Sequence, residues 1–232
     1  MKHYRDIFFD LDHTLWDTDN NAGRVLDQLY HQYNLAEKGI GTLEAFKAIY
    51  KQINERFWMD YAHGLVSKSD LRFKRFAQTL QHFGVKNYDL SYALSADFTS
   101  FTPRQKGLMP FALEVLDYLL NKGYTLTILT NGFTDAQKIK ITSAGLDSYF
   151  THLVTAEETG FKKPSVEIFN FALQLTKGNP EETLMIGDNL TTDIGGARQA
   201  GIDQVYFNPF HEKHEEIVTF EVDSLLGLKE IL

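Results

Sequence analysis

The sequence of 232 residues contains no cysteine. The chain therefore cannot form disulfides, cysteine zinc sites or iron–sulfur clusters, and it cannot use a thiol as a nucleophile. Basic residues are also in short supply, because 23 Lys and Arg stand against 31 Asp and Glu, for a net charge of −8. Nucleic-acid polymers and anionic membranes bind clustered Lys and Arg, so the sequence argues against both kinds of partner.

Long apolar runs are missing as well. The first apolar run, residues 7–9, stops at Asp10, whereas a signal peptide needs about 7–15 apolar residues at this place. No other stretch approaches the roughly 20 apolar residues of a membrane-spanning helix. We therefore expect a cytoplasmic protein, and its 43% of apolar residues are enough for a folded core.

Helical periodicity dominates residues 20–98. Apolar side chains recur three and four residues apart, for example at Leu26 and Leu29, which is the spacing of one helical face. Ser67 and Asp70 stand three apart, as in a capping box that opens a helix. The pattern predicts four helices and no strand in this segment.

Strand-like runs occur on both sides of the helical segment and alternate with helices in its C-terminal part. They cover residues 5–11, 125–129, 153–155, 183–186 and 205–207. Repeated strand–helix units predict an α/β fold with a parallel sheet covered by helices on both faces. We expect residues 1–15 and 101–232 to form this core, and residues 16–100 to form an inserted helical domain.

Polar residues follow two of the strands. Asp10 and Asp12 come directly after the first strand, and Thr130 and Asn131 follow the second, before Gly132. Ligands of parallel sheets bind at the carboxyl ends of strands. An Asp-x-Asp pair alone is equally compatible with an acidic loop or helix cap. Asn-Gly alone is typical of a hairpin turn, but here a helix follows, whose start suits an anion.

Two further groups lie nearer the C-terminus. Lys163 stands directly before Pro164, a pattern that by itself is typical of a solvated loop. Asp188 follows the strand of residues 183–186, and Asp193 stands five residues later at a predicted helix start. Helix capping explains Asp193 but not a carboxylate at the strand end.

Together these four motifs, in this order and with a helical insert after the first, resemble the haloacid dehalogenase-like hydrolase superfamily of aspartate-nucleophile phosphatases. The resemblance covers essentially the whole chain. It implies a Rossmann-like parallel sheet with strand order 5-4-1-2-3, and a helical cap of the C1 type formed by residues 16–100.

The resemblance also implies a role for each motif. Asp10 is expected to be the nucleophile that forms an aspartyl-phosphate, and Asp12 the general acid and then the general base. Thr130 and Asn131 would hold the phosphoryl oxygens. Lys163 would neutralise these oxygens and fix Asp10.

A Mg²⁺ site is implied by the same family. Asp10, Asp188 and the backbone carbonyl of Asp12 are the expected ligands, and Asp193 is expected as a further or water-mediated one. Carboxylates that converge in one pocket repel one another unless a cation is present, and Mg²⁺ prefers such hard oxygen ligands. We also expect an elevated pKa for Asp12, because an acid must hold its proton near neutral pH.

Several choices remain within this picture. The family's lysine directly precedes the proline, which selects Lys163 over Lys162. His13 departs from the residues that relatives often carry after the acid, and it is expected at the surface. His211 and His214 lie three apart in an acidic stretch, for which a solvated face is the favoured interpretation over a metal site.

The substrate is expected to be a small phosphorylated metabolite. Asp12 favours a phosphatase, because dehalogenases of the family lack an acid there. The segments of residues 10–17, 129–132 and 206–209 resemble the pyrimidine 5′-nucleotidase subgroup, so a nucleoside 5′-monophosphate is favoured. Alternatives are a sugar-phosphate or phosphoglycolate phosphatase, a phosphomutase and a non-catalytic phospho-acceptor domain. Aromatic residues of the insert could stack on a base, although a place in the helical core is favoured for any one of them, and the candidates to test are Trp16, Trp58 and Tyr61.

Overall fold

The computed structural model describes residues 2–232, which form two compact units. The first unit contains the chain up to Thr18 together with Lys106–Leu232, and the second is Asp19–Gln105. These units describe how the chain packs. The functional division into a core and a cap of residues 16–100 stays a prediction.

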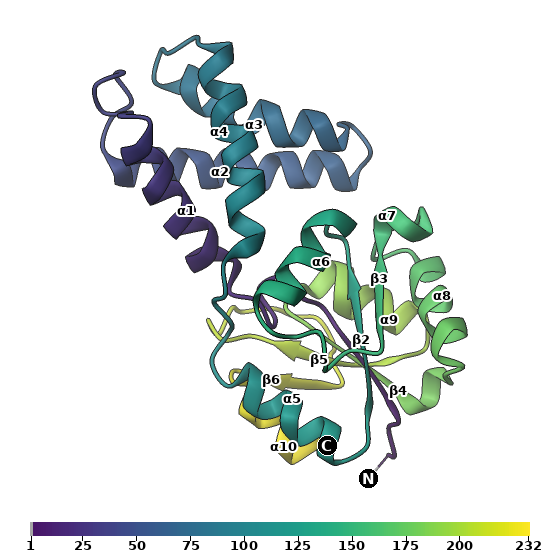
Figure 1. The fold of residues 1–232 in the computed structure, drawn as a ribbon. Helices are drawn as coiled ribbons and strands as arrows, with labels where there is room; N and C mark the ends of the chain where they lie inside the picture. Colours follow the sequence, from purple (N-terminus) through teal and green to yellow (C-terminus); the bar gives the residue numbers. More distant parts are fainter. Residues whose placement is uncertain (1) are drawn as a thin grey trace. The chain divides into compact units, whose positions relative to one another are not determined.

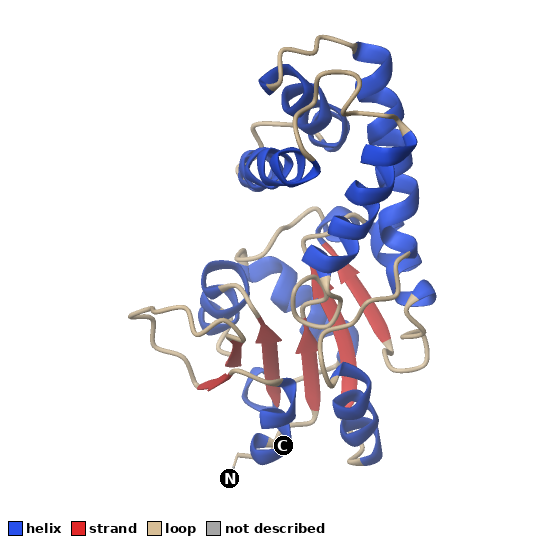
Figure 2. Cartoon of the chain, turned by 90° about the vertical axis from the view of Figure 1, so that its left-hand side faces the viewer, coloured by secondary structure: helices blue, strands red, loops and turns tan. Residues whose placement is uncertain are grey.

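A parallel sheet of six strands forms the centre of the first unit (Figures 1 and 2). Its strands are β1 (Asp6–Phe9), β2 (Thr125–Thr130), β3 (His152–Thr155), β4 (Thr183–Gly187), β5 (Asp203–Phe207) and β6 (Phe220–Val222). Their order is β3-β2-β1-β4-β5-β6, and all neighbours are parallel. The expected order 5-4-1-2-3 is confirmed, and β6 extends it by one edge strand that the sequence analysis did not predict.

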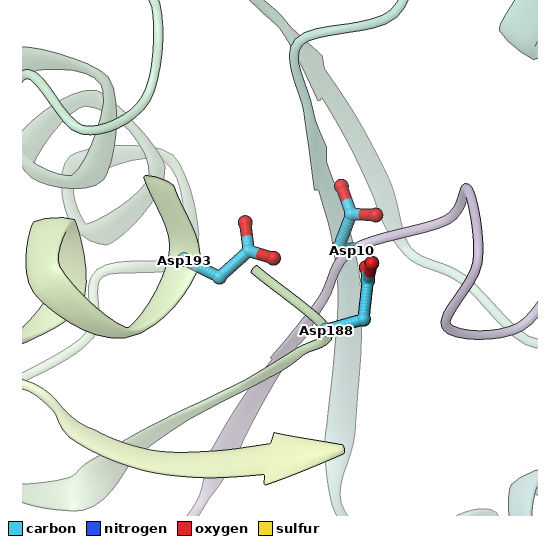
Figure 3. A group of neighbouring side chains, drawn as sticks. All are labelled: Asp10, Asp188 and Asp193. Carbon is cyan, nitrogen blue, oxygen red and sulfur yellow. The ribbon is translucent and has the colours of Figure 1, made fainter. Parts of the chain in front are cut away.

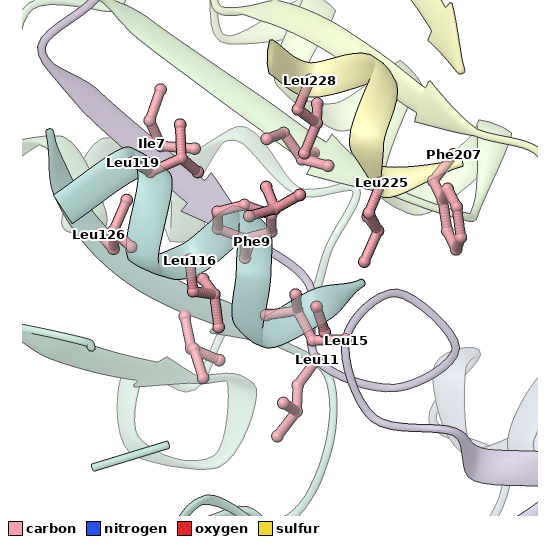
Figure 4. Packing of buried hydrophobic residues seen from close by; sticks show 14 of the residues in the cluster. Ile7, Phe9, Leu11, Leu15, Leu116, Leu119, Leu126, Phe207, Leu225 and Leu228 are labelled. Carbon is pink, nitrogen blue, oxygen red and sulfur yellow. The ribbon is translucent and has the colours of Figure 1, made fainter. Parts of the chain in front are cut away.

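Helices cover both faces of this sheet. They are α5 (Ala112–Asn121), α6 (Thr134–Ser143), α7 (Ala156–Thr159), α8 (Val166–Thr176), α9 (Gly196–Gln199) and α10 (Leu228–Ile231). Ile7 and Phe9 pack in one apolar cluster, which includes Leu116 of α5 (Figure 4), whereas Phe8 packs in the cluster of α8 and α9. Successive strand residues point to opposite faces. A strand covered on both sides therefore needs apolar side chains in succession, as Ile7, Phe8 and Phe9 of β1 provide.

Four short helical turns lie between the helices and strands, three in the first unit and η1 at the end of the second. Three are 3₁₀ turns: η1 (Thr102–Arg104), η2 (Pro180–Glu182) and η4 (Leu225–Gly227). The fourth, η3 (Leu190–Gly195), is a π-helical turn between β4 and α9. Such turns often occur at functional sites.

The second unit is built from helices with a core of their own. They are α1 (Thr18–Gln32), α2 (Leu43–Ala62), α3 (Lys68–His82) and α4 (Tyr88–Phe101). Leu26 and Leu29 of α1 pack with Phe46 of α2 in the buried cluster, and the capping box of Ser67 and Asp70 opens α3. The predicted helical insertion between strands 1 and 2 is confirmed. None of the helices in residues 2–232 combines the length and the apolar character needed to cross a membrane.

Candidate active site

Three carboxylates from different segments meet at the carboxyl edge of the sheet. Asp10 follows β1, Asp188 follows the neighbouring strand β4, and Asp193 projects from η3 toward both of them (Figure 3). One carboxylate oxygen of each lies within 4.8 Å of the others. The sequence analysis expected these three residues to lie together, and parallel pairing of β1 with β4 is what brings the first two side by side.

A buried lysine holds two of these carboxylates. Lys163 Nζ lies 2.6 Å from Asp10 Oδ1 and 2.6 Å from Asp193 Oδ1, and Lys163 is only 3% exposed. A lysine is almost never buried to this extent unless it is paired. The positive charge of Lys163 thus stabilises two neighbouring carboxylates, Asp10 and Asp193.

The two polar residues after β2 are used differently from each other. Asn131 Nδ2 donates to the Lys163 carbonyl over 2.9 Å, and the Lys163 N–H donates to Asn131 Oδ1 over 2.8 Å. The Asn131 side chain therefore anchors the segment that carries Lys163. Thr130 Oγ1 accepts the Gly132 N–H over 3.0 Å, which leaves its own hydroxyl proton to donate. Contact of Thr130 and Asn131 with phosphoryl oxygens stays a prediction.

The remaining carboxylates have neighbours that the sequence did not single out. Buried Thr14 donates to Asp188 Oδ1 over 3.0 Å. Asp193 Oδ2 accepts the Asn189 N–H over 3.1 Å, while its Oδ1 faces Lys163. Because both oxygens of Asp193 are engaged, Asp10 and Asp188 are better placed to give an oxygen to an ion. Whether Asp193 binds the ion directly or through water stays a prediction.

Burial dominates the electrostatics of the cluster. It raises the pKa of Asp10 to about 8, against the charge of Lys163 and with the help of the neighbouring carboxylates. Burial and the charge of Asp193 raise the pKa of Asp188 to about 7. Burial lowers the pKa of Lys163, but Asp10 and Asp193 outweigh it and leave that pKa above its ordinary value. Without a cation, Asp10 and Asp188 therefore tend to keep their protons near neutral pH, because one lysine does not offset three ionised carboxylates.

The donor set fits a hard divalent cation. The three carboxylates offer oxygen atoms only, close together and largely buried, and no other group of three or more His, Asp or Glu side chains in residues 2–232 meets the same distance criterion. Mg²⁺ takes oxygen ligands of this kind, usually one or two carboxylates together with water and phosphate oxygens. Asp10 and Asp188 would hold it, and Asp193 would support them.

We expect Mg²⁺ to bind more tightly as the pH rises. Carboxyls with pKa values of about 8 and 7 keep their protons up to those pH values, and a metal ion must displace these protons to bind. The affinity at pH 8 should exceed that at pH 6 by at least about 10-fold, with proton release at pH 7. Calorimetric titration of Mg²⁺ in two buffers of different ionisation enthalpy measures both quantities. An affinity that does not change with pH would contradict the pKa values.

The carboxylate of Asp12 points to α6. Lys140 Nζ donates to its Oδ1, and Gln137 Nε2 donates to its Oδ2 over 2.9 Å. Burial raises the pKa of Asp12, but the charge of Lys140 and the two hydrogen bonds outweigh it, and the pKa lies below its ordinary value. The expected elevation is wrong for the free protein, because Lys140 and Gln137 stabilise the ionised carboxylate. These two residues were not singled out from the sequence, although they stand three apart and therefore on one face of the helix after Gly132.

The other candidates are divided by their burial. His13 is exposed, with a left-handed φ of 63°, so the surface prediction is confirmed. Trp16 is fully buried in the core of the first unit and is not available to stack on a base. Trp58 and Tyr61 lie on α2, half-buried and in edge-to-face contact, and their role stays a prediction.

The two histidines near the C-terminus each face a carboxylate, and neither is part of the carboxylate cluster. His211 Nε2 lies 3.9 Å from Asp223, with both side chains exposed. His214 Nε2 lies 3.3 Å from Glu221 and packs against the Tyr206 ring, so it is less solvated than expected.

Comparisons with known proteins agree with this geometry. A family model described as haloacid dehalogenase-like hydrolase matches residues 4–201. Pyrimidine 5′-nucleotidase PynA of Streptococcus pneumoniae is 34% identical over 99% of this chain and 95% of its own length. Pyrimidine 5′-nucleotidase YjjG of Escherichia coli is 32% identical over 97% of this chain and 96% of its own. The crystal structure of the hydrolase YfnB of Bacillus subtilis bound to magnesium has a TM-score of 0.88 at 30% identity, covering 99% of both chains.

Proposed function

The chain belongs to the haloacid dehalogenase-like hydrolase family, and we propose that it is a Mg²⁺-dependent phosphatase acting on a nucleoside 5′-monophosphate. The observation that carries the phosphatase proposal is the arrangement of Asp10 beside Lys163, Asp188 and Asp193, with a second carboxylate, Asp12, two residues further on. A nucleophile, a charge-neutralising group and an acid–base group are the three functions that phosphate monoester hydrolysis needs.

The first half of the reaction transfers the phosphoryl group to Asp10. An oxygen of Asp10 attacks phosphorus, the bond from phosphorus to the leaving oxygen breaks, and Asp12 gives that oxygen a proton. Lys163 offsets the negative charge beside Asp10. When bound, Mg²⁺ supplies further positive charge to the phosphoryl oxygens.

The second half regenerates the carboxylate. Asp12, now ionised, takes a proton from a water molecule, whose oxygen attacks phosphorus and displaces the Asp10 carboxylate. The lowered pKa of Asp12 suits this second step. For the first step Asp12 must be protonated, and a dianionic phosphate group beside it raises its pKa because like charges disfavour the ionised form.

The nucleotide as substrate is supported by similarity alone. The segments of residues 10–17, 129–132 and 206–209 resemble the pyrimidine 5′-nucleotidase subgroup, and two relatives at 34% and 32% identity are pyrimidine 5′-nucleotidases. A sugar phosphate or phosphoglycolate is the alternative, and it would use the same five charged residues.

Phosphate release from a panel of monoesters tests the proposal. With Mg²⁺ present, we expect kcat/KM for UMP, CMP and dTMP to exceed that for AMP, glyceraldehyde 3-phosphate and phosphoglycolate by at least about 10-fold, about 1.4 kcal/mol of discrimination. A sugar phosphate as best substrate would overturn the nucleotidase and keep the phosphatase. An isomer without free phosphate, or a stable phosphoprotein without turnover, would overturn both.

A further inference from the structure

Three side chains hold the carboxylate of Asp12. Lys140 Nζ and Thr18 Oγ1 both donate to Oδ1, the latter over 3.0 Å, and Gln137 Nε2 donates to Oδ2 over 2.9 Å. Lys140 and Gln137 lie three residues apart on α6, and therefore on one face of that helix. Both oxygens of Asp12 are thus fixed from the same helix.

Neither of these two side chains on α6 donates a hydrogen bond to a group other than Asp12 in residues 2–232. Lys140 and Gln137 are 8% and 1% exposed, and in residues 2–232 the only ion pair of Lys140 is with Asp12. Lys140 Nζ also lies 4.3 Å from the centre of the Trp16 ring, which a cation favours. Burying a lysine and an amide is costly unless their donors are satisfied, and here Asp12 satisfies both.

The amide of Gln137 is used on one side only. Its Nε2 serves Asp12, whereas its Oε1 is buried without a hydrogen-bond partner in the described structure. A buried unsatisfied acceptor destabilises a fold. The position therefore keeps a side chain that is unfavourable for stability and that donates to Asp12.

Gly132 provides the space for this side chain. A Cβ at Gly132 would lie 2.0 Å from Gln137 Nε2 and 2.6 Å from its Cδ, and the backbone of Gly132 does not have the positive φ that would otherwise require glycine. The preceding residue, Asn131, anchors Lys163. The turn after β2 thus serves both residues, because Asn131 anchors Lys163 beside Asp10 and Gly132 leaves space for Gln137 beside Asp12.

We propose that Gln137 and Lys140 are positioning residues that orient Asp12 for proton transfer, and that Gly132 is glycine because Gln137 must pass over it. The inference rests on the proposed role of Asp12 as acid and base. We expect Gln137, Lys140 and Gly132 to affect the proton-transfer steps, and not the attack of Asp10 on phosphorus or the binding of phosphate.

Leaving groups of different basicity test the proposal. p-Nitrophenolate leaves without a proton, whereas a nucleoside alkoxide needs one, and kcat/KM reports only the steps up to departure of the leaving group. Lys140→Met and Gln137→Ala should lower kcat/KM for a nucleoside monophosphate by about 10- to 100-fold. For p-nitrophenyl phosphate, kcat and KM should fall together, with kcat/KM within about 3-fold of the wild type.

Matched variants separate this effect from a general loss of structure. Lys138→Met removes an exposed lysine of the same helix, which pairs with Glu158. This variant should leave kcat/KM for both substrates unchanged. Lys140→Arg should recover part of the activity on the nucleotide. A thermal melt of each variant is the control that tests whether it is folded.

A double-mutant cycle tests Gly132. Gly132→Ala should reproduce the leaving-group signature of Gln137→Ala. In the Gln137→Ala background the same change should have no further effect, because the three nearest atoms to the new Cβ all belong to the Gln137 side chain beyond its own Cβ. Additive effects would show that Gly132 acts by another route and would overturn this part of the proposal.

Asp12→Asn is the reference that separates this inference from the proposed function. If Asp12→Asn shows the leaving-group signature and the Lys140 and Gln137 variants do not, the positioning role is wrong and the phosphatase mechanism stands. If Asp12→Asn itself affects both substrates equally, Asp12 is not the general acid, and the positioning role falls with it.

Discussion

Asp10→Asn should reduce phosphate release by at least about 10⁴-fold, which is the scale seen when a nucleophile is removed from a covalent mechanism. The amide has nearly the shape of the carboxylate, and its oxygen can still accept from Lys163 Nζ, which lies 2.6 Å from Asp10 Oδ1. It cannot form an aspartyl-phosphate, so the loss should appear in kcat for every substrate, whatever the leaving group.

The same variant should fold normally. Burial raises the pKa of Asp10 to about 8, so near neutral pH the folded protein gains little from ionising this carboxyl, and a neutral amide costs little stability. The melting temperature without metal should therefore be unchanged or higher. Asp27→Asn, which changes an exposed carboxylate that pairs with Lys47, is the matched control and should keep full activity.

Mass spectrometry of the quenched reaction adds a direct readout. Wild-type protein mixed with substrate should carry a phosphoryl group on the peptide that contains Asp10, and Asp10→Asn should carry none. If the variant kept full phosphatase activity, the covalent mechanism and the roles built on it would be wrong.

Withdrawal of Mg²⁺ should reduce turnover to background and should also abolish the binding of inorganic phosphate. Asp10, Asp188 and Asp193 bring three carboxylates together, and Lys163 pairs with two of them, while Asp12 nearby is paired with Lys140. When the acids are ionised, a phosphate dianion meets a net negative site. A divalent ion reverses this balance.

Two measurements follow the withdrawal. Phosphate release should fall to background with EDTA and return when Mg²⁺ is added back. Addition of Ca²⁺ should not restore phosphate release, because Ca²⁺ is larger than Mg²⁺ and takes six to eight ligands at longer distances. A thermal shift with inorganic phosphate should be seen only with Mg²⁺. Full turnover in protein shown to be metal-free by elemental analysis would contradict the assignment of the carboxylates.

The order of the sheet and the convergence of the acids could be predicted from the apolar runs together with the family resemblance. Apolar runs that end in Asp10 and Asp188 indicate strand ends, and the family resemblance places those strands side by side, as the pairing of β1 with β4 confirms. Strand β6 was not predicted, because Phe220–Val222 has only three residues, none of them fully buried, in an acidic stretch. Nothing in so short a run separates a strand from a loop.

The surroundings of Asp12 could not be predicted, because they depend on tertiary packing. Lys140 and Gln137 are typical of a solvated helix face in the sequence, and only the position of α6 relative to the loop after β1 buries them. The expected elevation of the Asp12 pKa was wrong for this reason. Trp16 was likewise a candidate to stack on a base, but it is buried in the interior, where Lys140 Nζ packs on its ring.

The central position of β1 also determines when a newly made chain can fold. Its residue Asp6 pairs with Thr125 on one side and with Thr183 on the other. Both edges of the first strand therefore stay open during most of synthesis on the ribosome, and unpaired strand edges favour aggregation. The contiguous helices α1 to α4 can form their own core in this interval, since local contacts fold quickly. Of the clustered carboxylates, Asp188 and Asp193 emerge last, so a chain that ends before residue 188 lacks two of the three and cannot assemble the cluster.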